Sequence, residues 1–214
     1  MTNLFWNTVT EDMRSVLSGF TQNDLGQRFY LAGGTALSLQ IGHRLSVDLD
    51  FFSQTEDIPS VHRELEKAVE PYQAALADSS WVNLLYVVNE TRIGFYGYGY
   101  ALVAPLVESE DVRLASVEDI ALMKLDAILS RASRKDFYDL YYICQSTPLS
   151  QIFQKAPQKY PSVRDFEVQA TKRLTFFENA KNETDPVLLH NVSWNTVKDF
   201  FIQQAKDIER NWLQ

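Results

Sequence analysis

The chain has 214 residues and a mass of 24.6 kDa, with 45% hydrophobic and 22% charged residues, a globular composition that suits one large domain or two small lobes. Its formal net charge of -8 disfavours non-specific nucleic-acid binding, because phosphates attract clustered Lys and Arg, but a local basic patch stays compatible with it. A single cysteine excludes an internal disulfide and a cysteine-cluster metal site, and the absence of a long apolar or signal-peptide segment predicts a cytoplasmic protein with no membrane partner.

The first half of the chain alternates predicted helices and strands. Apolar residues at helical spacing between Val9 and Phe20 predict an opening amphipathic helix. Residues 28–32 then have the pattern of a short buried strand, followed by a glycine turn into a helix that stops near Gly42. The segment SVDLDFF, residues 46–52, is predicted to be the next strand.

A second helix and a hairpin are predicted next. Helical periodicity extends over residues 61–77. Residues 81–88 and 92–100 are rich in aromatic and β-branched side chains, and the intervening NET segment has turn chemistry, so the two runs should form an antiparallel hairpin.

The remainder of the chain is predicted to be helical. Ser116 with Asp119, and Ser133 with Asp136, each have the capping-box spacing at the start of a helix, with Asp in place of the usual Glu. Helical patterns also cover residues 163–180 and 194–213. We therefore expect an α+β lobe over residues 1–115 and a helical lobe over residues 116–214 that completes an active-site cleft.

Asp48 and Asp50 are unusual residues for a strand. Because side chains alternate along a strand, both carboxylates project from one face while Leu49 and Phe51 enter the core. Two neighbouring carboxylates repel each other, and a hard cation removes this penalty. Mg²⁺ is typically held by one or two carboxylates together with substrate phosphates, so the pair predicts a metal–triphosphate site.

The upstream Gly33-Gly34-Thr35 turn points to the same chemistry. Glycines let the backbone approach a ligand closely, and a helix that opens at Thr35 would offer free N–H groups to phosphate. Thr35 could cap that helix or donate to a phosphate oxygen. Taken singly, a Gly-Gly turn often only begins a helix and an Asp-x-Asp pair is often a solvated face; the combination favours a metal-bound nucleotide.

These residues resemble the first signature of the nucleotidyltransferase superfamily, a glycine turn opening a helix followed by Asp-x-Asp on the next strand. More narrowly, the chain resembles the AbiEii/AbiGii toxin family. Members carry a Lys on a helix, an Arg about two turns later and a (Lys/Arg)-Asp-x-x-Asp-Leu cluster, which correspond here to Lys124, Arg131 and residues 135–140. The resemblance covers about residues 28–145.

The resemblance implies a minimal nucleotidyltransferase fold, a mixed sheet with flanking helices plus a helical C-terminal lobe, and transfer of a nucleoside monophosphate from an NTP. In toxin relatives the acceptor is RNA, particularly tRNA ends, and a separate antitoxin neutralises the toxin. By analogy, the expected roles are Mg²⁺ binding by Asp48 and Asp50, triphosphate binding by Gly33, Gly34 and Thr35, phosphate pairing by Lys124, and an essential acid at Asp136.

Further positions have two interpretations each: Lys124 with Arg131, Asp136, Arg44 and Ser46 could serve the site or only the fold and surface. Lys124 and Arg131 are seven residues apart, so one helix face should present both cations to the triphosphate, although a solvated face fits the spacing equally well. Asp136 could instead cap its helix, in which case Asp139 could be the acid that matters. Arg44 and Ser46 are expected either to contact the nucleotide or to be solvated loop residues.

The sequence departs from the superfamily pattern at one strand. Many nucleotidyltransferases carry a third carboxylate there, yet no acidic residue occurs between Glu90 and Glu108, and Gly94 or Phe95 stands where it is expected. A catalytically silent nucleotidyltransferase fold that binds nucleotide or a partner protein is therefore one alternative. A small-molecule nucleotidyltransferase acting on aminoglycoside-like cations is another, since the acidic chain attracts cations.

Overall fold

The computed structural model describes residues 3–22, 24–109 and 112–212. The chain divides into two compact units. Unit 1 comprises Met1–Ala101 and Pro105–Ser116, and unit 2 comprises Leu102–Ala104 and Val117–Gln214. In the described part of the chain, no helix is both long enough and apolar enough to cross a membrane.

Unit 1 is built on a mixed sheet whose strand order is β3-β4-β5-β2-β1-β7-β6. The central strand β2 pairs parallel with β5 and antiparallel with β1, and β1 pairs parallel with β7. This confirms the predicted mixed α/β fold. The strands are β1 (Tyr30–Ala32), β2 (Asp48–Ser53), β3 (Ala75–Ser79), β4 (Asn83–Val88), β5 (Thr91–Gly97), β6 (Val107–Glu108) and β7 (Arg113–Leu114).

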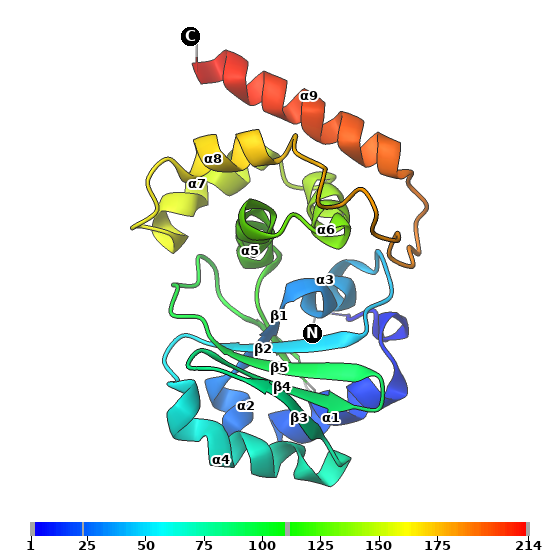
Figure 1. Cartoon of the computed structure of the whole chain (residues 1–214), viewed down its shortest axis with the longest axis vertical. Helices are drawn as coiled ribbons and strands as arrows, with labels where there is room; N and C mark the ends of the chain where they lie inside the picture. Colours follow the sequence, from blue (N-terminus) through cyan, green and yellow to red (C-terminus); the bar gives the residue numbers. More distant parts are fainter. Residues whose placement is uncertain (1–2, 23, 110–111, 213–214) are drawn as a thin grey trace. The chain divides into compact units, whose positions relative to one another are not determined.

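Helices cover both faces of this sheet (Figure 1). One face is covered by α1 (Glu11–Thr21), α2 (Leu25–Arg28) and α4 (Ile58–Val69), and the other by α3 (Gly33–Ile41). Two short 3-10 helices, η1 (Trp6–Thr8) and η2 (Glu70–Tyr72), flank α1 and α4.

Strand alternation gives β2 one apolar and one polar face. Leu49 and Phe51 are buried, and Phe51 packs against Phe20 of α1 and Phe95 of β5 with ring centroids 4.4 and 5.3 Å apart. Asp48 and Asp50 are partly exposed on the opposite face. The core therefore fixes the register that places both carboxylates on one side of the sheet, as predicted.

Two predicted elements of unit 1 are confirmed. Helix α1 buries Met13, Leu17 and Phe20, and the Thr10 hydroxyl accepts a hydrogen bond from the backbone N–H of Met13 as its N-cap. The predicted hairpin is formed by β4 and β5, and Asn89 in its turn has a φ of 53°, a conformation that Asn tolerates better than most residues.

The helix predicted over residues 61–77 is wrong at its C-terminal end. Helix α4 ends at Val69, and residues 75–79 form the edge strand β3. Pro71 has no backbone N–H to continue the helical ladder, and Gln73 has a φ of 55°, which reverses the chain. The apolar spacing that continued past Val69 belongs to a strand with all of its residues exposed.

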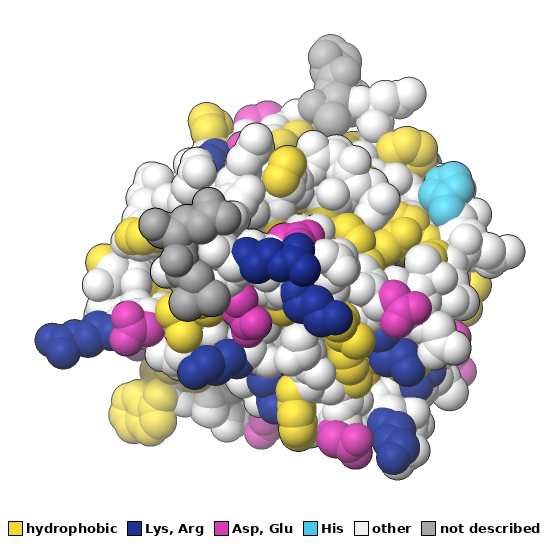
Figure 2. Space-filling view, turned by 90° about the horizontal axis from the view of Figure 1, so that it is seen from above, with side chains coloured by type: hydrophobic (Ala, Val, Ile, Leu, Met, Phe, Trp, Pro, Cys, Tyr) yellow, Lys and Arg dark blue, Asp and Glu magenta, His cyan; other side chains and the backbone are white. Residues whose placement is uncertain are grey.

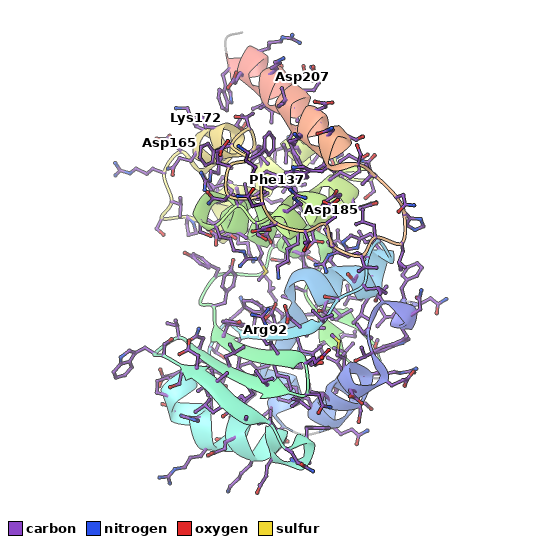
Figure 3. The ribbon with its side chains drawn as sticks, turned by 45° about the vertical axis from the view of Figure 1, so that its right-hand side comes forward. Arg92, Phe137, Asp165, Lys172, Asp185 and Asp207 are labelled. Atoms are coloured by element: carbon purple, nitrogen blue, oxygen red, sulfur yellow. The ribbon has the colours of Figure 1, made fainter. Side chains whose placement is uncertain are left out.

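Unit 2 is helical. Its helices are α5 (Val117–Ser130), α6 (Arg134–Cys144), α7 (Leu149–Lys159), α8 (Phe166–Arg173) and α9 (Trp194–Trp212). Helix α5 contacts α6, α7 and α8, and Phe137 of α6 packs against Phe177, Trp194 and Phe201 (Figure 3). The helix predicted over residues 163–180 is shorter than expected, and residue 213 of the last predicted helix lies outside the described residues.

The predicted capping box at Ser133 and Asp136 is wrong. The Ser133 side chain makes no cap hydrogen bond and instead donates to Glu183 at 2.7 Å, while the Asp136 carboxylate pairs with basic side chains. A cationic donor forms a stronger hydrogen bond to a carboxylate than a backbone N–H does. The Asp136 carboxylate therefore pairs with Lys124 and Arg131 rather than capping its helix.

Asp119, the acid of the other predicted box, is also buried with a cation. Its Oδ1 lies 2.9 Å from Lys159 Nζ, and both side chains are fully buried. The same carboxylate accepts hydrogen bonds from the backbone N–H groups of Val103 and Ala104. Helices α5 and α7 and the segment Leu102–Ala104 are therefore tied together by one buried ion pair.

We predict that Lys159→Met destabilises unit 2 by about 3–5 kcal/mol, because it leaves Asp119 buried without its cation. The matched control is Lys155→Met on the same helix, whose exposed pair with Glu118 at 2.9 Å should contribute only about 0–1 kcal/mol. Chemical denaturation of both variants measures the difference. Equal losses of unfolding free energy would contradict the assignment.

Candidate active site

The glycine turn lies against the second aspartate of β2. Gly33 has a φ of 67°, in the left-handed region, and begins α3 directly after β1. A β-carbon at this position would lie 3.0 Å from Asp50 Oδ2, so only glycine lets the turn approach the carboxylate this closely. The structure thus brings together the two motifs that the sequence placed in one site.

Thr35 connects α3 to the first aspartate through its hydroxyl. Thr35 Oγ1 donates a hydrogen bond to the backbone carbonyl of Asp48. The Ser46 hydroxyl lies 2.7 Å from Thr35 Oγ1. Because a hydroxyl has one proton, Ser46 is the donor to Thr35. These bonds fix the start of α3 against the start of β2.

The expected start of α3 is corrected by this geometry. The helix begins at Gly33 rather than Thr35, its N-cap is Ala32, and no side chain caps it. Thr35 is buried, so its hydroxyl holds the strand rather than the helix end. The sequence does not show which glycine of the pair has a positive φ. In the structure it is Gly33, and the helix begins there.

Arg44 and Ser46 are not solvated loop residues. Both are buried, Arg44 donates to the backbone carbonyl of Leu45 at 3.0 Å, and the Ser46 N–H donates to the carbonyl of Thr8 at 2.9 Å. Alternate residues of the loop before β2 are therefore buried, whereas Leu45 and Val47 between them are exposed.

Asp48 and Asp50 form a suitable start for a cation site. They are alternate residues on one strand face, and the Asp48 side chain is 20% exposed. Carboxylate oxygens are the ligands that hard divalent cations prefer. Over the described ranges, no group of three or more His, Cys, Asp or Glu side chains could hold a metal. A cation bound here would thus take its other ligands from phosphate and water.

Arg92 is a residue of this face that the sequence analysis did not single out. In the parallel register of β2 and β5, Arg92 is opposite Asp48 and Gly94 is opposite Asp50. The Arg92 Nε lies 3.3 Å from Asp48 Oδ1, and 60% of the Arg92 side chain is exposed. Only the pairing register, which spans a separation of 44 residues, reveals this contact.

The expected position of a third carboxylate is now defined. Phe95, one of the two expected positions, belongs to the buried face and packs on Phe51, so it is excluded. Gly94 shares the face of the aspartates, but a β-carbon there would lie 2.5 Å from the Tyr96 ring. An acid at position 94 would therefore require Tyr96 to move.

Aromatic rings extend the same sheet face beyond the aspartates. The Phe52 ring stacks on Tyr96 with centroids 4.9 Å apart and meets Tyr98 edge-on at 5.3 Å. Phe52 and Tyr96 are only partly buried. Phe95 is buried in the core on the other face of the sheet. The rings of Phe52, Tyr96 and Tyr98 instead form a partly exposed aromatic surface.

The second sequence block forms a compact ionic cluster inside unit 2. The Lys124 ammonium lies 2.9 Å from Asp136 Oδ1 and 2.6 Å from Asp139 Oδ2, and the Arg131 Nε lies 2.9 Å from Asp136 Oδ2. The Lys124 side chain is 6% exposed and both carboxylates are fully buried, whereas Arg131 is 58% exposed. A solvated helix face is therefore the wrong explanation for Lys124.

The pKa of Asp136 is set by this cluster. Burial alone raises the pKa, but the Lys124 ammonium and the Arg131 guanidinium outweigh it, so the pKa lies below the ordinary value of an aspartate. Asp136 is thus ionised at neutral pH.

The fold and the site of unit 1 define the class. A mixed sheet carries a glycine turn that opens a helix, and an Asp-x-Asp pair lies beside that turn on the adjoining strand. This arrangement brings the N–H groups of a helix start next to two carboxylates, which suits a metal-bound triphosphate. A nucleotidyltransferase requires this combination of groups.

Comparison with known proteins assigns the family. The model of the nucleotidyl transferase AbiEii toxin family, of type IV toxin–antitoxin systems, matches residues 15–83 and 87–212, so the chain belongs to this family. An uncharacterised protein of Aquifex aeolicus (strain VF5) is 30% identical, over 94% of this chain and 98% of that protein.

Solved structures share the fold. A nucleotidyltransferase candidate from H. pylori has a TM-score of 0.60 at 17% identity, covering 94% of this chain and 93% of that one. MenT4, a nucleotidyltransferase toxin from Mycobacterium tuberculosis H37Rv, has a TM-score of 0.58 at 15% identity, covering 94% and 84%. The antibiotic-resistance factor ANT(2'')-Ia has a TM-score of 0.52 at 16% identity, covering 67% and 86%.

We predict that Gly33→Ala impairs the site more than its backbone strain explains. The β-carbon would push against Asp50 and should lower nucleotidyl transfer on the order of tenfold, since small displacements of catalytic groups are costly. Gly99→Ala is the matched control, because Gly99 has a φ of 68° and no atom within 4 Å of the added carbon. Equal transfer rates in the two variants would refute the contact.

The lowered pKa of Asp136 predicts a pH dependence of stability. Since the folded pKa lies below the unfolded value, the stabilisation is present above about pH 4 and is lost as the pH falls through the folded pKa. The difference in unfolding free energy between the wild type and Asp136→Asn should therefore stay steady above about pH 4 and shrink as the pH is lowered below it. A difference that does not shrink, measured by denaturant titration, would contradict the pairing.

Proposed function

We propose that this chain transfers a nucleoside monophosphate from an NTP to RNA, with tRNA as the acceptor, and that Mg²⁺ is its cofactor. One observation carries the proposal: the Gly33 turn and the Asp50 carboxylate lie in contact, with Asp48 alternate to Asp50 on the same strand face. A bound triphosphate would reach helix N–H groups and a carboxylate-held cation at once.

Asp48 and Asp50 are the residues that would hold Mg²⁺. The bound cation would neutralise phosphate charge and polarise the phosphoryl oxygens. The Thr35–Asp48 and Ser46–Thr35 hydrogen bonds keep the first carboxylate at the start of α3, so the protein's contribution is positioning. The N–H groups of Gly33, Gly34 and Thr35 lie in the first turn of α3, where anions bind favourably.

Lys124 and Arg131 are proposed to neutralise phosphate charge, and Asp136 and Asp139 to position them. Lys124 is held by both carboxylates, which restrict its ammonium to one place. Arg131 has its Nε and Nη2 bonded to Asp136 at 2.9 Å while 58% of its side chain stays exposed, so a phosphate could approach the guanidinium from solvent. Asp136 then acts through the two cations.

The aromatic surface of Phe52, Tyr96 and Tyr98 is proposed to stack the nucleobase. Bases stack on aromatic rings without needing a particular sequence, and these partly exposed rings share the sheet face of Asp50. Such stacking would bring the base beside the carboxylate that binds the triphosphate.

The toxin family is the ground for proposing RNA as the acceptor, and the surface shown in Figure 2 is compatible with it. Family membership implies a toxin whose partner is an antitoxin protein, and MenT4 is itself described as a nucleotidyltransferase toxin. On the face shown in Figure 2, Lys and Arg side chains lie among acidic and hydrophobic ones. Local basic groups are thus present despite the net charge of -8.

A second candidate acceptor is a cationic small molecule. ANT(2'')-Ia, which has a similar fold, has been solved with adenylyl-2"-tobramycin, and the acidic charge of this chain would attract such a drug. The third carboxylate that is missing from β5 favours instead a silent nucleotide-binding fold. Both alternatives are decided by the same assay.

We predict that the protein incubated with Mg²⁺ and each labelled NTP transfers label to total tRNA. Asp48→Asn should reduce the rate on the order of 100-fold or more, because it removes one of the two carboxylates that hold the cation. Asp78→Asn on the edge strand β3 is the control and should keep wild-type activity. Unchanged folding is checked by the melting temperature.

The acceptor is identified by where the label goes. The same reaction is run with aminoglycosides beside the tRNA. If the label appears on the aminoglycosides and not on tRNA, the acceptor is a small molecule. NTP binding without transfer would support the silent fold. Transfer that survives Asp48→Asn would show that the site is wrongly assigned.

A further inference from the structure

Arg92 takes the place on β5 that a further carboxylate could occupy. The two positions of β5 opposite Asp48 and Asp50 are Arg92 and Gly94, and the Tyr96 ring covers Gly94. Position 92 is thus the open one on this face, and it carries a cation. A three-carboxylate face would have a charge of about -3, whereas this one has about -1, which favours fewer bound cations.

The geometry of the pair suits an exchangeable contact. The Arg92 Nε is 3.3 Å from Asp48 Oδ1, and Arg92 extends from β5 with 60% of its side chain exposed (Figure 3). An exposed ion pair of this kind is weak, typically worth less than about 1 kcal/mol. A divalent cation that binds Asp48 could therefore displace it, and the released guanidinium would lie next to the phosphates that the cation brings.

We propose that Arg92 is a positioning residue that balances Asp48 until a divalent cation binds, and that this face, with Arg92 where a third carboxylate could stand, holds one such cation. The inference rests on the proposed function, because it takes Asp48 and Asp50 as the cation ligands. It adds a residue that neither the Asp-x-Asp motif nor the glycine turn specifies.

The test measures Mn²⁺ binding to the full-length protein, without any acceptor, by electron paramagnetic resonance titration. Wild type should bind one Mn²⁺. Arg92→Ala should bind one Mn²⁺ about twofold to fivefold more tightly, because the competing guanidinium is gone. Arg92→Lys keeps a cation at this position and should stay closer to the wild-type affinity.

A matched control separates this contact from a general effect of charge. Arg63→Ala removes the same charge from an exposed position on α4, which covers the other face of the sheet. It should leave the Mn²⁺ affinity unchanged. An equal gain in Arg63→Ala and Arg92→Ala would overturn the proposal, as would an unchanged or weakened affinity in Arg92→Ala.

The limit of one cation is tested by Arg92→Asp. This variant places three carboxylates on one face, so it should bind two Mn²⁺ in the presence of a non-hydrolysable NTP analogue, and Mn²⁺ should raise its melting temperature more than that of wild type. A single Mn²⁺ in this variant would overturn the limit, and so would two in the wild type. These measurements need no transfer to RNA, so they hold even if the acceptor is another molecule. A wild type that binds no Mn²⁺ would refute the proposed function as well.

Discussion

Asp48 and Asp50 carry like charges on one face of a single strand, and the surrounding elements provide what keeps them there. On the other face, the aromatic core of Phe20, Phe51 and Phe95 fixes the register, because a slip by one residue would bury the carboxylates. On their own face, Arg92 provides a positive partner from β5 and the Gly33 turn leaves room beside Asp50. In the proposed function, a cation bound together with phosphate would offset the repulsion between the two acids.

Unit 2 meets the same electrostatic constraint by a different route. Its buried acids are Asp119, Asp136 and Asp139. Asp119 pairs with the buried Lys159, and the other two pair with the buried Lys124. Asp136 also pairs with Arg131, which is mostly exposed. Such pairs are costly to break, because removal of one partner leaves a buried charge. Lys124 and Arg131 make ion pairs within the helical unit and are also proposed to neutralise phosphate, so a variant of either can confuse the two effects. Arg131, which is mostly exposed, is the better position at which to separate them.

Much of the fold could be predicted from the sequence because local chemistry determines it. Strand alternation placed Asp48 and Asp50 on one face, and turn residues identified the β4–β5 hairpin. Other features depend on contacts between distant residues. The Arg92–Asp48 pair requires the β2–β5 register, the strand β3 replaces the end of a predicted helix after Pro71, and Asp136 is paired with buried cations rather than with its own helix end. No periodicity within a single segment reports such contacts.

The carboxylate pair and the glycine turn are proposed to bind one metal-bound triphosphate. A crystal structure of the protein with Mn²⁺ and a non-hydrolysable NTP analogue tests this proposal most directly, because anomalous scattering locates the cation independently of the chain. The expected result is an anomalous peak about 2.0–2.3 Å from oxygens of both Asp48 and Asp50, with phosphate oxygens at the backbone of residues 33–35. A cation bound away from this pair, or a triphosphate that does not touch the turn, would contradict the account.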